Sequence, residues 1–197
     1  MKVINNFKMY KKCLIVVDMV NGFVREGVLH DKNIEIIIPI QIKLIKETLA
    51  YGGLVIFIKD THNKDSKEFK RFGNTYHCLE GTKEADLVDE LIPYEGLENT
   101  ISIEKNSTSF MEAPDFRKVV KNLDNVEEYG ICGCCTDICV VNGAIGLANY
   151  NDQWNRDVTI KAYKDAIATY GENIRQNYID AAYLLMEQQG IQLVKRK

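Results

Sequence analysis

The chain has 197 residues, of which 46% are hydrophobic, and its 25 Lys and Arg against 28 Asp and Glu give a formal net charge of −3. This length fits one domain, residues 1–197, with a sizeable core, and the composition excludes a mainly disordered chain. A sequence pI near 5.7 supplies no basic field for nucleic acid or an anionic membrane, and no apolar run is long enough to span a bilayer.

Short apolar runs alternate with longer segments of helical period along the chain. We expect strands at residues 13–17, 54–58, 101–103, 129–132, 158–162 and 191–194, and helices at 38–51, 84–92, 114–122, 137–150 and 172–189. Most of these strands are too continuously apolar to have one face in water, which is typical of parallel strands covered on both sides. The alternation predicts an α/β fold, a three-layer α/β/α sandwich around an open, mainly parallel six-stranded sheet.

Reactive side chains follow four of the predicted strands. They are Asp18, then Asp60 with His62, then Lys105, and finally a cysteine-rich turn at 132–139. In open α/β sheets, ligands bind beyond the carboxyl ends of the strands. Residues 60–83 also lack clear periodicity, and a connection that long in a compact domain is usually functional. The carboxyl ends of the first four strands are therefore the expected functional region.

Six cysteines occur at positions 13, 78, 132, 134, 135 and 139. The early apolar run ends at Asp18 without a small-residue cleavage site, so we expect no export signal, a cytoplasmic location and reduced thiols. The spacing within 132–139 does not match the Cys-x₂-Cys pairs of structural zinc sites. Most of these cysteines are expected to pack in the core as small apolar residues.

Cys139 is the exception, because it falls in the first turn of a predicted helix capped by Thr136 or Asp137. The helix dipole and the free N–H groups there favour a thiolate, which makes Cys139 a candidate nucleophile. Asp18 is the candidate base, since a carboxylate in the apolar segment VVDMV needs a partner or a function. Lys105 could be that partner, and an ordinary ion pair between the two is the alternative.

The long connection contains groups that suit a metal. Asp60, His62 and His77 offer a carboxylate and two imidazoles, a set that fits zinc, manganese or iron with positions left open for a ligand. On spacing alone, a solvated polar loop is the alternative. His30 is expected to be a surface residue.

Five segments together carry a family resemblance. They are VVDMVNGF at 16–23, IKDTH at 58–62, HCLEGT at 77–82, IEKNSTSF at 103–110 and TDICV at 136–140. Each motif alone would be weak, but the combination is specific. From about residue 13 to residue 194, the chain resembles the isochorismatase-like cysteine hydrolases, whose fold is Rossmann-like, and among them it is most similar to the nicotinamidases.

The resemblance implies a role for each reactive group. Cys139 matches the nucleophile, Asp18 the general base and acid, and Lys105 the cation that holds them. A cis peptide bond is implied before Cys135, so that the backbone N–H groups of Cys135 and Cys139 form an oxyanion hole. Phe23 corresponds to an aromatic residue that packs on the substrate ring.

Nicotinamidases hold a metal beside the nucleophile, where it binds the pyridine nitrogen. Asp60, His62 and His77 match its ligand positions, and Glu68 matches a ligand found in some members. The resemblance thus implies one divalent transition metal, with zinc as the first choice and manganese or iron as alternatives.

Two stretches depart from the family pattern. Val20 stands where many members have Gln or Asn, and RFGNTYHC at 71–78 replaces a shorter approach to the second histidine that often contains proline and sometimes a tryptophan. Phe72 or Tyr76 is the candidate for closing the pocket in place of that tryptophan. Cys78 receives no role.

The expected activity is hydrolysis of nicotinamide to nicotinate and ammonia through a thioester, as in NAD salvage. The expected ligand is a small-molecule amide, with no nucleic acid or membrane partner, and the resemblance implies a homo-oligomer. Two alternatives remain open. One is a related cysteine hydrolase acting on another small amide, ureide or carbamoyl compound. The other is a non-catalytic binding or redox-sensing module.

Overall fold

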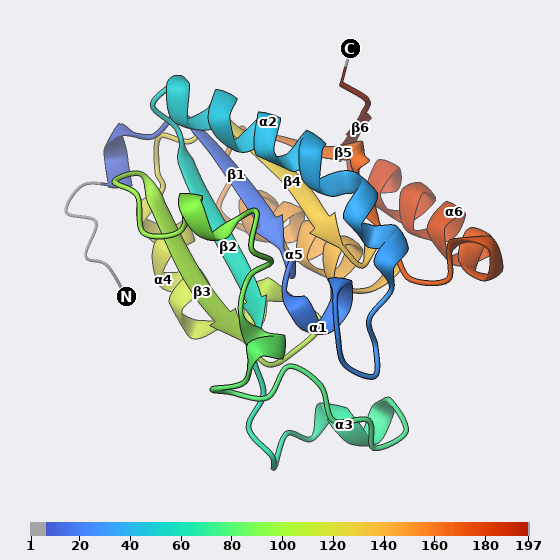
Figure 1. The fold of residues 1–197 in the computed structure, drawn as a ribbon. Helices are drawn as coiled ribbons and strands as arrows, with labels where there is room; N and C mark the ends of the chain where they lie inside the picture. Colours follow the sequence, from blue (N-terminus) through green and yellow to red (C-terminus); the bar gives the residue numbers. More distant parts are fainter. Residues whose placement is uncertain (1–6, 197) are drawn as a thin grey trace.

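The fold is built around one sheet of six parallel strands. The computed structural model describes residues 7–196, and the strands form one sheet in the order β3-β2-β1-β4-β5-β6 (Figure 1). Their bounds are β1 Lys12–Val17, β2 Leu54–Asp60, β3 Thr100–Lys105, β4 Glu128–Cys134, β5 Thr159–Ala168 and β6 Gln192–Val194. Each neighbouring pair is parallel. Every predicted strand is present, and the predicted fold class is confirmed.

Helices cover both faces of the sheet. Helix α2 (Ile38–Ala50) lies on one face, and α4 (Pro114–Asn122), α5 (Val141–Gln153) and α6 (Glu172–Gln188) lie on the other (Figure 1). Along β1, Leu14 and Val16 pack toward α2, whereas Cys13, Ile15 and Val17 belong to the core under the other three helices. This two-sided burial explains why the strand sequences are continuously apolar. None of the helices within residues 7–196 is both long and apolar enough for a membrane span.

Residues 84–92 do not form the helix that we expected. Short 3₁₀ turns at Lys83–Ala85 and Ile92–Tyr94 flank a stretch in which Leu87 forms an antiparallel bridge with Val20 and residues 89–91 form a turn. The side-chain amide of Asn21, in the short helix α1 (Asn21–Val24), donates to the carbonyls of Lys83 and Asp86. The apolar residues of this stretch fit a helical period, but contacts with Val20 and Asn21 hold the backbone around Leu87 extended.

The predicted helix at 137–150 begins differently from the expectation. One π-helical turn, Thr136–Val140, precedes α5, and Cys135 occupies the N-cap position without a side-chain cap. The prediction of Thr136 or Asp137 as the cap is therefore wrong. Asp137 instead accepts hydrogen bonds from the Thr169 hydroxyl and from Arg175. The Cys134–Cys135 peptide bond is cis, as the family resemblance implied.

Gly133 in β4 pairs with Val17 at the end of β1. Its φ is +123°, and a Cβ there would lie 2.0 Å from the carbonyl oxygen of Val17. We expect Gly133→Ala to lower the free energy of unfolding by roughly 3 kcal/mol or more. The strain of alanine at a positive φ and the overlap of its Cβ with the Val17 carbonyl both contribute. Chemical denaturation measures this. Gly81→Ala is the control, since its φ is +75° but the space around it is open, and a loss of about 1 kcal/mol is expected there. Equal losses at both sites would contradict the proposed overlap.

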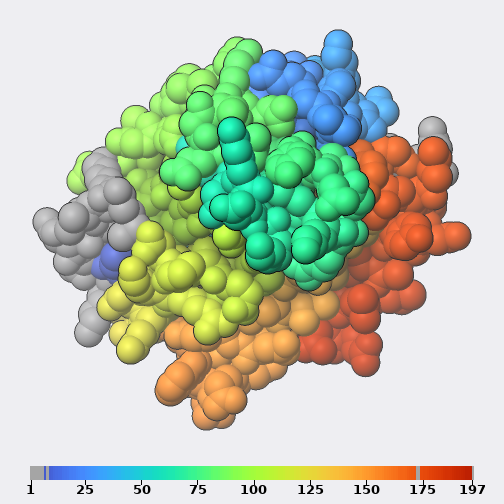
Figure 2. All heavy atoms as spheres, turned by 90° about the horizontal axis from the view of Figure 1, so that it is seen from below, coloured from blue at the N-terminus to red at the C-terminus, as the bar shows by residue number. Residues whose placement is uncertain are grey.

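The carboxyl edge of the sheet is covered by the segment that follows β2. This segment contains the short helix α3 (Glu68–Arg71), and a parallel bridge between His62 and Leu79 joins its two arms. The N–H of His62 donates to the carbonyl of Cys78, and the N–H of Glu80 donates to that of His62. Figure 2, viewed onto this edge, shows the teal and green residues of the segment over its centre.

Candidate active site

Lys105 brings three reactive side chains together. Its Nζ lies 2.7 Å from Oδ1 of Asp60, 2.9 Å from Oδ2 of Asp18 and 3.6 Å from Sγ of Cys139. All four residues are buried. Asp60 and Lys105 end two paired strands in register, Asp18 follows β1, and Cys139 follows β4. The expectation that the carboxyl ends of these strands bring the four side chains together is confirmed.

The pKa values of the buried charged groups shift in different directions. It raises the pKa of Asp18 to about 6, although Lys105 opposes the shift. Burial also acts against the charge of Asp60, but Lys105 and the histidines beside it hold the pKa of Asp60 well below its usual range. For Lys105, burial is outweighed by the two carboxylates, which raise its pKa. Asp18 is therefore the member of this group that can exchange a proton near neutral pH.

The thiol of Cys139 is neutral in this arrangement. Burial raises the pKa of the thiol, and Lys105 only partly opposes this. The sequence-based expectation of a thiolate held by the helix start does not describe the free protein. A neighbouring base must remove the proton when the sulfur reacts, and Asp18 contacts the same ammonium group.

Asp60, His62 and His77 form a compact set of metal-ligating atoms. One such atom from each residue lies within 4.8 Å of the others, and Nε2 of His62 and of His77 are 2.9 and 3.4 Å from Oδ2 of Asp60. Nδ1 of His77 donates to the carbonyl of Thr75 at 3.0 Å, so in the neutral ring the lone pair lies on Nε2, which faces Asp60. Nδ1 of His62 lies 3.0 Å from Oγ of Ser66. These outer contacts orient both rings, and the donor set fits a divalent transition metal.

Glu68 lies in the same cavity but outside this set. Its Oε2 is buried and has no hydrogen-bond partner among residues 7–196, although Nη2 of Arg71 lies 4.0 Å away. Burial raises the pKa of Glu68, and the charge of Asp60 adds to the shift. A buried carboxylate oxygen without a hydrogen bond is typical of a group that binds a cation or a proton.

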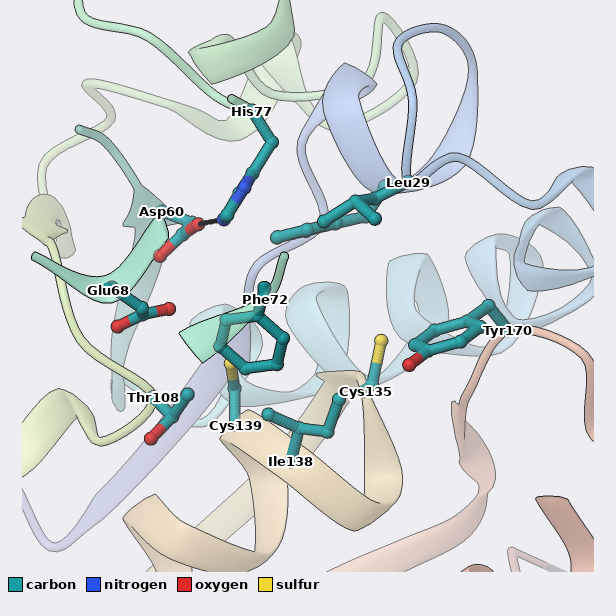
Figure 3. Close-up of a pocket in the computed structure, with 11 residues that line it drawn as sticks. Leu29, Asp60, Glu68, Phe72, His77, Thr108, Cys135, Ile138, Cys139 and Tyr170 are labelled. Atoms are coloured by element: carbon teal, nitrogen blue, oxygen red, sulfur yellow. Dashed lines mark ion pairs between the residues drawn. The ribbon is translucent and has the colours of Figure 1, made fainter. Parts of the chain in front are cut away.

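A pocket of about 480 Å³, including its open part, lies beside Cys139. Figure 3 shows Asp60, Glu68 and His77 on one side of the pocket and Cys135 and Tyr170 on the other. The apolar part of the wall comes from Phe23, Leu29, Phe72 and Ile138. The size and the mixture of apolar walls with a few polar groups fit a small flat molecule.

Phe23 lines the pocket as expected, with its ring centroid 5.8 Å from that of His77. Of the two candidates for closing the pocket, Phe72 lines it, whereas Tyr76 is 55% exposed and packs against Phe69.

Four lining residues were not predicted: Leu29, Thr108, Ile138 and Tyr170. Ligand-binding residues follow the carboxyl ends of the strands, and Tyr170 follows the end of β5. The predicted strand ended at residue 162, six residues before the observed end at Ala168, so Tyr170 was missed. No sequence pattern marks Leu29.

All six cysteines are buried free thiols. Cys13, Cys132 and Cys134 pack in the core as expected, and the Cys134 thiol donates to the carbonyl of Asp18 at 3.1 Å. Cys78, which had no expected role, is also a packing residue, since a Cβ on Gly22 would lie 2.6 Å from its Sγ. His30 is exposed, as predicted.

The sequence pattern of the isochorismatase domain matches residues 12–194. The chain belongs to the isochorismatase family. It is therefore an isochorismatase-like hydrolase, which confirms the class of enzyme that the five motifs predict. A curated relative, the uncharacterised isochorismatase family protein PncA of Bacillus subtilis, is 29% identical over 174 residues, which cover 82% of this chain and 88% of the relative.

Solved structures share the whole fold. The pyrazinamidase of Pyrococcus horikoshii in complex with zinc superimposes with a TM-score of 0.77 at 25% identity, covering 94% of this chain and 99% of that one. The nicotinamidase PncA of Bacillus subtilis gives a TM-score of 0.77 at 24% identity, with 93% and 99% of the two chains covered. The order of elements that positions the pocket is thus that of this family.

Proposed function

We propose that this protein is a metal-assisted cysteine amidohydrolase that converts nicotinamide to nicotinate and ammonia. The observation that carries the proposal is the position of Lys105, whose ammonium group contacts Cys139, Asp18 and Asp60 at the wall of one pocket. It joins a nucleophile and its base to a carboxylate of the metal-ligating set. The similarity to a pyrazinamidase and a nicotinamidase supports the choice of substrate.

The residues of the site can carry out both steps of the reaction, formation of a thioester and its hydrolysis. Asp18 takes the proton of the Cys139 thiol, and the sulfur forms a bond to the amide carbon. That proton moves to the amide nitrogen and the C–N bond breaks. Ammonia departs, and the acyl group remains on Cys139 as a thioester. Water then gives a proton to Asp18 and adds to the thioester, the C–S bond breaks, and the proton returns to the sulfur. Nicotinate is released.

The oxyanion formed in each half needs hydrogen-bond donors. We assign this role to the backbone N–H groups of Cys135 and Cys139, beside the cis peptide bond. One such donor typically contributes about 3–4 kcal/mol to lowering the barrier. Lys105 keeps Asp18 and the sulfur adjacent, and Phe23 and Phe72 hold the ring.

Asp60, His62 and His77 would hold the metal, with Glu68 as a further ligand, and zinc is the first choice over manganese or iron. When bound, a divalent metal supplies Lewis acidity toward a ring nitrogen or a water. Removing an imidazole should therefore weaken metal binding directly.

We expect His77→Ala to lower the affinity for zinc by roughly 100-fold or more, because a buried ligand is lost. Zinc content after dialysis against a competing chelator measures the change without relying on activity. His30→Ala is the matched control, since this histidine is exposed and outside the set. One tightly held zinc in His77→Ala would contradict the assignment of His77.

The rate should depend on the protonation of Asp18. Burial raises the pKa of this carboxyl to about 6, so the carboxylate that accepts the thiol proton dominates above that pH and disappears below it. We expect kcat/KM to fall about tenfold per pH unit on the acid side of about pH 6. Stopped assays of ammonia release over pH 4–8 measure this. A profile that stays flat well below pH 6 would exclude Asp18 as the base.

The substrate is tested by ammonia release over a panel that contains nicotinamide, pyrazinamide, benzamide, a ureide and an N-carbamoyl amino acid. Benzamide is the matched control, because it keeps the carboxamide but lacks the ring nitrogen. We expect nicotinamide to exceed benzamide by roughly tenfold or more in kcat/KM when zinc is present. Faster turnover of the ureide or the carbamoyl compound, independent of metal, would favour the alternative hydrolase.

A further inference from the structure

The outer side of α6 is an uncharged face. Seven exposed positions spaced three and four residues apart share one side of this helix. They are Ile174, Asn177, Tyr178, Ala181, Leu184, Leu185 and Gln188, which we call the α6 face. Helices on the surface of a protein normally place charged side chains on the side turned to water. In α6, the exposed charged residues Asp180 and Glu187 lie off this face.

The large side chains of the α6 face are strongly exposed. Ile174 is 87% exposed, Leu184 67%, Tyr178 60% and Leu185 48%. The core of the fold is formed by the opposite side of the helix, where Ile179, Ala182 and Met186 pack into the protein. Tyr178 contacts the Arg175 guanidinium, which lies 4.7 Å from its ring centroid and leaves the outer side of the ring exposed. A contiguous apolar surface of this kind marks an interaction site.

We infer that the α6 face is the contact surface of a homodimer, in which α6 packs antiparallel against α6 of a second copy. The face is centred on Ala181, with Ile174 and Tyr178 toward one end and Leu184 and Leu185 toward the other. A small residue at the centre lets two helices approach closely where they cross. In an antiparallel pair, Tyr178 of one copy meets Leu184 of the other.

The absence of charge makes this face complementary to itself. An isologous contact places the same patch on both sides, so any charge near its centre would meet a like charge. The seven positions present none. The apolar side chains expose on the order of 500 Å² per copy, and about 1,000 Å² in total is near the lower limit for a specific interface. A reversible dimer is therefore expected, which dissociates on dilution.

The N-terminal end of α6 is the end nearer the pocket, because Arg175 contacts the rings of both Tyr178 and the pocket residue Tyr170. The helix lies at the β6 side of the molecule, away from α3 and the segment that covers the carboxyl edge (Figure 1). The dimer does not depend on the proposed reaction, and it can be tested on the protein whatever its substrate.

The mass of the full chain in solution tests the inference. By sedimentation velocity at high micromolar concentration, we expect twice the chain mass of 22.5 kDa. Ala181→Lys combined with Leu184→Lys should weaken the dimer by roughly 100-fold or more, since like charges then meet at its centre. Lysine favours helices and both sites are exposed, so the melting curve should be unchanged. Ile36→Lys is the matched control, because Ile36 is 77% exposed in the turn Lys32–Ile37, which leads into α2.

A cross-link tests the antiparallel geometry. In Ala181→Cys, the new thiols of two copies lie at the crossing point, so mild oxidation should give a dimer on a non-reducing gel. The native thiols are buried, and Ile36→Cys should give no such product. A monomer at high concentration, or a dimer that survives the double lysine variant, would overturn the inference. A dimer that the lysines disrupt but that forms no cross-link at residue 181 would overturn its antiparallel arrangement.

Discussion

Cys139→Ala is expected to abolish ammonia release from nicotinamide, with a loss of roughly 10⁴-fold or more in kcat and no change in fold. Its Sγ lies 3.6 Å from the ammonium group that also contacts Asp18, so the sulfur lines the pocket with its base buried directly behind the same ammonium group. With alanine at this position, Asp18 can activate only water. Water is a weaker nucleophile than the sulfur, and its direct attack does not divide the reaction into two easier steps. Steady-state ammonia assays and the melting curve of the variant measure the two parts of this prediction.

Cys135→Ala is the matched control for this experiment. Cys135 lines the same pocket, but its proposed contribution is the backbone N–H, which alanine keeps. We expect the control to retain activity within a few-fold of the wild type. Acid-quenched wild type should carry a nicotinoyl group on Cys139, seen by mass spectrometry, and Cys139→Ala should carry none. A fully active Cys139→Ala protein would refute the covalent mechanism.

The sheet could be predicted because its strands are buried on both faces. Runs such as residues 54–58 have no polar residue to mark a wet side, and helices α2 and α4 to α6 explain this in the structure. Parallel strands bring their carboxyl ends to one edge, so Asp18, Asp60 and Lys105 could be placed together before any contact was known. Their distances confirm that placement.

Other features depend on contacts that no local pattern contains. The stretch 84–92 has helical spacing, but Asn21 and Val20 bind its backbone from far along the chain. Asp18 has a φ of 51°, a left-handed conformation that a sequence does not reveal for a residue other than glycine. The neutral state of the Cys139 thiol likewise follows from burial, which the helix-start argument did not include.

Lys105→Met is expected to lower the free energy of unfolding by about 3–5 kcal/mol and to remove activity. The ammonium group is the cation that contacts both Asp18 and Asp60 in the described part of the chain, and all three side chains are buried. Methionine fills much of the same volume, so the loss reports the missing cation rather than a cavity. Asp18 loses its ion-pair partner, whereas Asp60 keeps its contacts with His62 and His77. Chemical denaturation of the metal-free protein measures it.

The pH dependence of this loss separates charge from packing. Without Lys105, the pKa of Asp18 rises further above its unfolded value, because the group that opposes the effect of burial is gone. A carboxyl whose folded pKa is raised destabilises the protein increasingly as the pH rises from the unfolded pKa toward the folded one. The difference in the free energy of unfolding between Lys105→Met and the wild type should therefore be smaller near pH 5 than near pH 8.

Adding Asp18→Asn to Lys105→Met removes one of the two buried negative charges. The double variant should regain part of the lost stability at pH 8 while remaining inactive. A loss that is independent of pH and unaffected by Asp18→Asn would mean that Lys105 acts through packing alone.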